Sequence, residues 1–146
     1  MKHSALSQSY TVLGGDFSKA GVVSVRIKNL LKELGLSFNV IRRAAIAAYE
    51  AEMNVIMYAR EARVELSVSA GKVEVIFEDK GPGIPDISLA MKEGYSTASQ
   101  EMWEMGFGAG MGLPNIKKNS DSFRITSKVG EGTRLEISIS VNGRTS

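Results

Sequence analysis

The sequence contains no cysteine, and this absence removes several kinds of chemistry at once. Disulfide bridges, thiol nucleophiles and cysteine-ligated metals are excluded, and a reducing compartment such as the cytoplasm is the expected location. The only histidine is His3, in a terminal segment that we expect to be frayed. Histidine acid–base catalysis and a phospho-accepting histidine in a folded domain are therefore not expected.

Long apolar runs and an excess of charge of one sign are also missing. No stretch approaches the roughly 18 apolar residues of a membrane span, and residues 1–15 lack a signal-peptide core. The net charge is only +2, and the basic pairs at 42–43 and 117–118 are isolated. We therefore expect a soluble cytoplasmic protein that binds neither membranes nor nucleic acid directly. A chain of 146 residues, 43% of them hydrophobic, supports a single domain, residues 1–146, with a core over about 8–140.

Hydrophobic periodicity and turn residues predict an α+β domain. A first helix is expected to be capped by Asp16 or Ser18, and a second by Ser37 or Asn39. Strands are predicted at residues 8–13, 63–69, 72–78, 122–128 and 133–141, and helices at 16–34, 37–59 and 113–119, with a short helical turn within 86–93. The order of these elements indicates a two-layer sandwich with helices on one face of the sheet.

Glu50 and Asn54 are a carboxylate and an amide four residues apart in an alanine-rich helix, so they share one helix face. Magnesium prefers oxygen ligands, so Asn54 together with nucleotide phosphates is a sensible ligand set. Glu50, one turn away, could activate a hydroxyl group or a water molecule. The alternative is a helix with two polar surface residues. Glu52, on another helix face, is expected to be such a surface residue.

Asp79 follows an alternating apolar strand and is itself followed by Gly81 and Gly83. Its carboxylate could accept a hydrogen bond from the exocyclic amine of adenine, a charge-assisted bond worth roughly 1.5–3 kcal/mol. The two glycines would let a purine ring lie close to the backbone. The alternative is a polar turn after a strand.

A glycine run leads into the last predicted helix, after a loop from Gly81 that is long enough to be a lid. Gly108, Gly110 and Gly112 could turn backbone N–H groups toward phosphates. The chain has neither GxxxxGK[ST] nor a strict GxGxxG, so neither a P-loop nor a Rossmann crevice is predicted. Thr133 could be a further contact near the base, although an ordinary threonine that opens a strand is slightly favoured.

Taken in order, Glu50-x-x-x-Asn54, Asp79-x-Gly81-x-Gly83, the glycine-rich lid and Gly130-x-Gly132-Thr133 resemble the motifs of the GHKL (Bergerat-fold) ATPases. Within that family the chain is similar to the bacterial anti-sigma factor and switch-protein serine kinases of the RsbT type. The stretches at 78–97 and 108–118 carry this likeness. The resemblance implies a mixed, mostly antiparallel sheet with helices on one face and an ATP lid. Residues 98–105 lengthen the lid relative to this pattern.

The same resemblance implies roles for single residues. Glu50 would be the general base, Asn54 the Mg²⁺ ligand and Asp79 the adenine contact. Gly81 and Gly83 would line the base, and the three lid glycines would hold the phosphates of ATP. The implied substrate is a serine or threonine on a STAS-domain antagonist protein.

Three functions remain open from the sequence. The first is a Mg-ATP-dependent serine/threonine protein kinase in a partner-switching pathway. The second is a non-catalytic, ATP-gated anti-sigma factor or activator that binds a sigma factor or a phosphatase. The third is an interaction domain that binds no nucleotide. A homodimer is possible in each case, because the apolar stripe of the first helix fits either a core or a dimer surface.

Overall fold

A five-stranded sheet forms one layer of the domain. The computed structural model describes residues 6–92 and 112–141. The strands are β1 (Leu6–Leu13), β2 (Glu61–Val68), β3 (Lys72–Lys80), β4 (Ser122–Lys128) and β5 (Gly132–Ser140). Their order across the sheet is β1-β2-β3-β5-β4. Each of these four pairings is antiparallel, where the resemblance implied a mixed, mostly antiparallel sheet.

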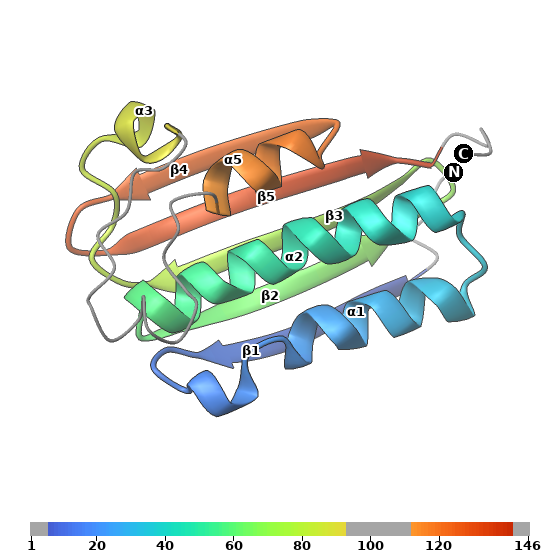
Figure 1. The fold of residues 1–146 in the computed structure, drawn as a ribbon, viewed down its shortest axis with the longest axis horizontal. Coiled ribbons are helices and arrows are strands. Elements are labelled where there is room, and N and C mark those ends of the chain that lie inside the picture. Colours follow the sequence, from blue (N-terminus) through green and yellow to red (C-terminus); the bar gives the residue numbers. More distant parts are fainter. Residues whose placement is uncertain (1–5, 93–111, 142–146) are drawn as a thin grey trace.

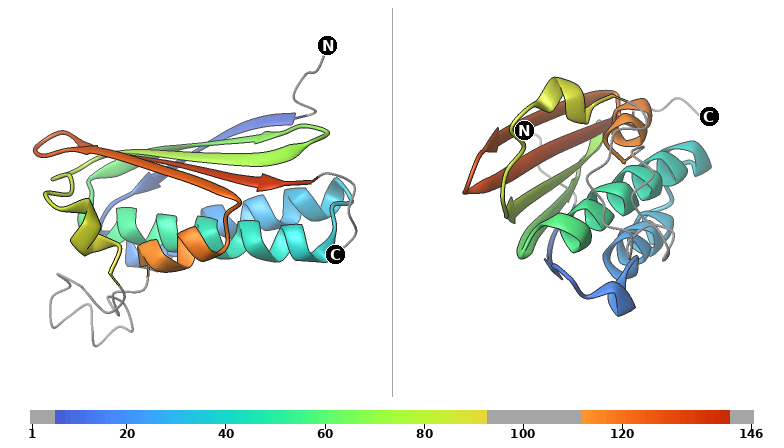
Figure 2. Two further views of the ribbon diagram at one scale, coloured as in Figure 1. Left: turned by 90° about the horizontal axis from the view of Figure 1, so that it is seen from above. Right: turned by 60° about the vertical axis from the view of Figure 1, so that its left-hand side comes forward.

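Three α-helices form the second layer and cover one face of this sheet (Figures 1 and 2). They are α1 (Val22–Glu33), α2 (Phe38–Tyr58) and α5 (Gly112–Lys118), and α2 packs between the other two. A 3₁₀ turn at Phe17–Lys19 and the short α3 (Ile87–Ala90) complete the described elements. This arrangement confirms the predicted α+β sandwich.

The core lies between the two layers. Alternate residues of β2, β3 and β5 point toward the helices and are buried, Phe77 among them. Ala44, Ala47, Ala48 and Ala51 form the buried stripe of α2, and none of them is exposed. Small side chains let the α2 backbone lie close to the sheet, which places the polar residues on its flanks near the strand ends.

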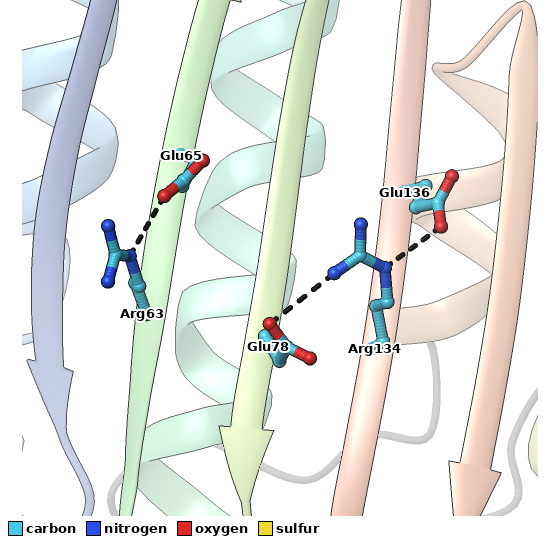
Figure 3. Close-up of polar contacts among 5 residues, drawn as sticks. All are labelled: Arg63, Glu65, Glu78, Arg134 and Glu136. Carbon is cyan, nitrogen blue, oxygen red and sulfur yellow. Dashed lines mark hydrogen bonds and ion pairs between the residues drawn. The ribbon is translucent and has the colours of Figure 1, made fainter.

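The opposite face of the sheet carries charged side chains and faces away from the helices. Figure 3 shows Glu78, Arg134 and Glu136 in a row across β3 and β5. Arg134 donates to Glu136 at 2.9 Å and to Glu78 at 3.3 Å, while Arg63 pairs with Glu65 along β2. Because these pairs are exposed to solvent, water and salt screen them and each adds little to the free energy of unfolding. These ion pairs account for the polar residues at alternate positions of the strands, but they do not hold the two layers together.

Helix α1 begins later than the sequence predicts, and a distant residue caps it. Neither Asp16 nor Ser18 caps it, because a 3₁₀ turn intervenes and Gly21, with φ of 92°, is the N-cap. Glu52 of α2 supplies the cap: its two carboxylate oxygens accept from the backbone amides of Val23 at 3.1 Å and Ser24 at 2.9 Å.

Glu52 is 1% exposed, so the expectation of a polar surface residue is wrong. Its negative charge is stabilised by the two amides and by the positive end of the α1 dipole. The carboxylate therefore joins the start of α1 to the middle of α2.

Glu52→Gln is expected to lower the free energy of unfolding by about 1–3 kcal/mol, because the amide turns a donor toward one of two buried backbone donors. Urea unfolding followed by circular dichroism measures this effect. Glu33→Gln is the matched control, since Glu33 is exposed on α1 and should change stability by less than about 0.5 kcal/mol. Equal stability of Glu52→Gln and the native chain would contradict this role.

Local capping works as predicted at the second helix. Ser37 is the N-cap of α2, and its hydroxyl accepts from Val40 N at 3.3 Å. The turn at Ala70-Gly71 joins β2 and β3, closed by a hydrogen bond from Ser69 N to Lys72 O.

Among the described residues, no helix combines the length and the apolarity that crossing a bilayer requires.

Candidate functional site

Glu50, Asn54 and Gly112 lie together where α5 packs on α2. Glu50 and Asn54 are one turn apart on the flank of α2, and both are half-buried. A Cβ atom at Gly112 would lie 3.3 Å from Asn54 Oδ1 and 3.7 Å from Glu50 Oε1. The structure thus brings three predicted residues from two distant segments to one place. A side chain at Gly112 would therefore contact both the carboxylate and the amide.

Asn115 orients Glu50, and the sequence did not single it out. Asn115 Nδ2 donates to Glu50 Oε2 at 3.2 Å. Burial raises the pKa of Glu50 above its ordinary value, and the hydrogen bond from Asn115 partly opposes that rise. A carboxylate with a raised pKa is a stronger base while it remains ionised. The available signal was position, since Asn115 follows Gly112 by three residues and so lies on the same face of α5.

Asp79 forms a second cluster at the end of β3. Its position continues the buried face of that strand, and its side chain is half-buried. Thr133 N of the neighbouring β5 donates to Asp79 Oδ1 at 3.0 Å. Burial raises the pKa of Asp79, and the bond from the Thr133 amide partly offsets this. The predicted pair Asp79 and Thr133 is therefore in direct contact, through the threonine backbone.

Two glycines are required here by close backbone contacts. Gly83 has φ of 78°, and a Cβ atom there would lie 2.5 Å from the carbonyl oxygen of Lys128. Gly132 has φ of 148°, and its Cβ would collide with the carbonyl oxygen of Asp79. The sequence explained Gly83 by approach to a ligand. The structure gives it a packing role against the β4–β5 turn, which the sequence did not anticipate.

The first cluster lies beside Asn54 of α2, and the second lies near Ala59, the C-cap of the same helix. Gly81 is packed against Ala59, since a Cβ at Gly81 would lie 3.1 Å from the Ala59 Cα and 3.3 Å from Asp79 Oδ1. Ala59 follows Asn54 by five residues, a rise of about 7–8 Å at 1.5 Å per residue. A ligand of nucleotide length could therefore reach both clusters at once.

A third feature, the hydroxyl of Ser127, was also missed by the sequence reasoning. Ser127 Oγ accepts from Ile84 N at 2.7 Å and lies 2.8 Å from Thr133 Oγ1. It thereby ties the segment after Gly83 to the strand that carries Thr133. A serine in a half-buried strand position gives no sequence signal of such contacts.

Part of the predicted site falls outside the described residues. Gly108, Gly110 and the lid segment 98–105 lie outside the part of the chain that the structure describes. Within residues 6–92 and 112–141, no group of three or more histidine, cysteine, aspartate or glutamate side chains could hold a metal ion. Asn54 therefore stays a predicted Mg²⁺ ligand, and Mg²⁺ is often bound through few protein groups.

Comparison with known proteins assigns the family. Residues 39–143 match the family model described as histidine kinase-, DNA gyrase B- and HSP90-like ATPase, which spans most of the chain. The chain belongs to this family. The matched range contains the residues that lie in the two clusters: Glu50, Asn54, Asp79, Gly112 and Thr133.

Individual relatives narrow the branch of this ATPase family. The chain is 34% identical to the serine/threonine-protein kinase RsbT of Bacillus subtilis over 113 residues, which cover 75% of the chain and 79% of RsbT. It is 28% identical to the anti-sigma F factor of Clostridium kluyveri over 116 residues, 76% of the chain and 78% of that protein. These likenesses agree with the RsbT-type branch that the motifs indicated.

A solved structure supports the fold of this ATPase domain. The mycobacterial sensor histidine kinase MprB superposes on the chain with a TM-score of 0.54 and 16% sequence identity. The superposition covers 91% of this chain and 97% of the MprB chain. At that identity the likeness concerns the fold alone. It agrees with the helix-covered antiparallel sheet of Figure 1.

Proposed function

We propose that this chain is a serine/threonine protein kinase that binds Mg-ATP along α2 and phosphorylates a STAS-domain antagonist protein in the cytoplasm. The observation that carries the proposal is the placement of Glu50. Its carboxylate is half-buried, accepts a hydrogen bond from Asn115 and lies close to Gly112, where α5 begins. The likeness to a named serine/threonine-protein kinase supports this assignment.

Each end of the site would hold one end of the nucleotide. At one end, Asp79 would accept from the exocyclic amine of adenine, with Gly81 and Thr133 beside it. At the other, Asn54 would offer its amide oxygen to Mg²⁺, while Gly112, with the lid residues Gly108 and Gly110, would face the phosphates. Mg²⁺ held there by Asn54 would neutralise charge on the phosphates.

The chain itself would supply positioning and a base. Phosphoryl transfer depends mainly on alignment, and the packing of α2 against both the sheet and α5 would hold the two clusters in place relative to each other. Glu50 would accept the proton of the incoming hydroxyl group. Asn115 would keep the carboxylate oriented toward that group.

A test of the whole proposal is to incubate the purified chain with γ-labelled ATP, MgCl₂ and each STAS-domain protein encoded in the same genome. We expect label on a serine or threonine of one of them, and loss of labelling in EDTA. Labelling of no STAS-domain protein, with ATP binding intact, would favour the second candidate.

That second candidate is a non-catalytic, ATP-gated anti-sigma factor or activator. The 28% identity to an anti-sigma F factor favours it. It predicts tight, nucleotide-dependent capture of a sigma factor or a phosphatase without transfer of phosphate. Sedimentation of the chain with and without ATP would also show whether it forms a homodimer.

The pH dependence of the reaction tests the role of Asn115. Asn115→Ala removes the hydrogen bond that lowers the pKa of Glu50, so this pKa should rise further. Because Glu50 acts as a base only when ionised, the acidic limb of the profile of kcat/KM against pH should move to higher pH. Lys117→Ala, on the exposed face of α5, is the control and should leave the limb in place. A limb that moves to lower pH, or not at all, would contradict the assignment of Glu50.

A further inference from the structure

Two hydroxyl groups face each other across β4 and β5 beside Asp79. Ser127 and Thr133 are direct cross-strand partners, and their side-chain oxygens lie 2.8 Å apart. Thr133 also contacts Asp79 through its backbone amide. The direction of the hydrogen bond between the two hydroxyls therefore decides whether Thr133 offers a donor or an acceptor to a ligand beside Asp79.

Ser127 has two more contacts that limit where its proton goes. Ile84 N donates to Ser127 Oγ at 2.7 Å, and the carbonyl oxygen of Gly132 lies 3.1 Å from the same oxygen. A serine hydroxyl donates one hydrogen bond and accepts two. The carbonyl can only accept, so its contact requires the Ser127 proton.

One proton arrangement satisfies all three contacts. Ser127 donates to Gly132, accepts from Ile84 and accepts from Thr133. The reverse direction, from Ser127 to Thr133, leaves the carbonyl of Gly132 without that donor and so makes one hydrogen bond fewer. The first arrangement is favoured because each such bond in a half-buried site is net stabilising.

In this arrangement the Thr133 oxygen can only accept hydrogen bonds, because its proton is held by Ser127. An ionised Asp79 also only accepts. Asp79 and Thr133 continue the register in which Glu78 pairs with Arg134, so their side chains lie on the same face of the sheet. Two acceptors on that face suit an amino group, which has two N–H donors. They disfavour a carbonyl oxygen at the same position, since no donor is offered to it.

We propose that Ser127 determines base specificity by holding the Thr133 proton, so that the site selects a 6-aminopurine over a 6-oxopurine nucleotide. This inference rests on the proposed nucleotide site. It assigns Ser127 a positioning role that acts through Thr133, without contact to the base.

The test compares ATP with inosine triphosphate, which carries a carbonyl oxygen in place of the amino group, by isothermal titration of the full chain with MgCl₂. Ser127→Ala frees the Thr133 proton, which can then be donated to the carbonyl. The ratio of ATP to inosine triphosphate affinity should fall about 10-fold, with inosine triphosphate binding more tightly than to the native chain.

Three companion variants separate this role from a structural one. Ser127→Thr retains the hydroxyl and should retain the native ratio. Thr133→Val should lower the ratio by itself, and Ser127→Ala added to it should change the ratio no further, because the two residues act as a unit. Ser122→Ala, on an exposed position of β4, is the matched control.

The outcomes are distinct. If Ser127→Ala weakens both nucleotides by the same factor, or changes the ratio equally in the Thr133→Val background, this inference is overturned and the proposed function stands. If the native chain binds neither nucleotide, the proposed function fails and this inference fails with it. Should Ser127→Ala not fold, an unchanged ratio in Thr133→Val would overturn the inference alone.

Discussion

Glu50→Gln is expected to reduce phosphoryl transfer to the STAS-domain substrate by about 10²–10⁴-fold, the usual contribution of a general base. The glutamine retains the shape of the side chain and an oxygen that can accept from Asn115, so packing between α2 and α5 should persist. Affinity for ATP should change by less than about threefold, because the lost group acts on the incoming hydroxyl rather than on the nucleotide. Single-turnover transfer of labelled phosphate and calorimetric titration with ATP measure the two quantities separately.

Two results would count against this role of Glu50. Transfer at the native rate would show that another group accepts the proton or that none is needed. An equal loss of ATP affinity and transfer would show that Glu50 belongs to the binding surface alone. Either outcome would remove Glu50 from the role of general base.

Asp79→Asn is expected to weaken ATP binding by about 10–150-fold, which corresponds to losing a charge-assisted hydrogen bond of roughly 1.5–3 kcal/mol. The substituted amide also has two donors, one of which would oppose either the Thr133 amide or the amine of adenine. A chain that binds no nucleotide would show no change in the titration.

Glu78→Gln is the matched control for Asp79. Glu78 is the preceding residue and points to the opposite, charged face of the sheet, where it pairs with Arg134 (Figure 3). The substitution removes a carboxylate one residue away and should leave ATP affinity unchanged. Equal effects of the two substitutions would mean that Asp79 acts through general charge rather than through contact with the base.

Features controlled by neighbours in the sequence could be predicted. The cap of α2 by Ser37 and the turn at Ala70-Gly71 depend on a few consecutive residues, and both are observed. The pairing of Glu50 with Asn54 follows from helix periodicity. The strands followed from alternation, and their predicted limits differ from the observed limits by up to two residues.

Features that depend on residues far apart in the sequence could not be predicted. The start of α1 is set by Glu52, which lies 28 and 29 residues from the amides that it caps. Asn115 reaches Glu50 across 65 residues, and Ile84 reaches Ser127 across 43. No local pattern encodes such contacts, because they appear only once the helices pack on the sheet.

The fold explains why the predicted site residues of α2 lie on one flank of that helix. Its alanine stripe is buried against the sheet, so its polar residues turn to the sides. On one side of α2, the buried Glu52 binds the start of α1. On the other side, α5 packs beside Glu50 and Asn54. The β3–β5 pairing then brings Asp79 and Thr133 to the end of the same helix.

The most direct test is a crystal structure of the chain with Mg-ADP. We expect the adenine amine within hydrogen-bonding distance of Asp79, the metal ligated by Asn54 Oδ1 and the phosphates beside Gly112. Density for the nucleotide at any other place, or an Asn54 side chain turned away from the metal, would contradict the site described for this chain.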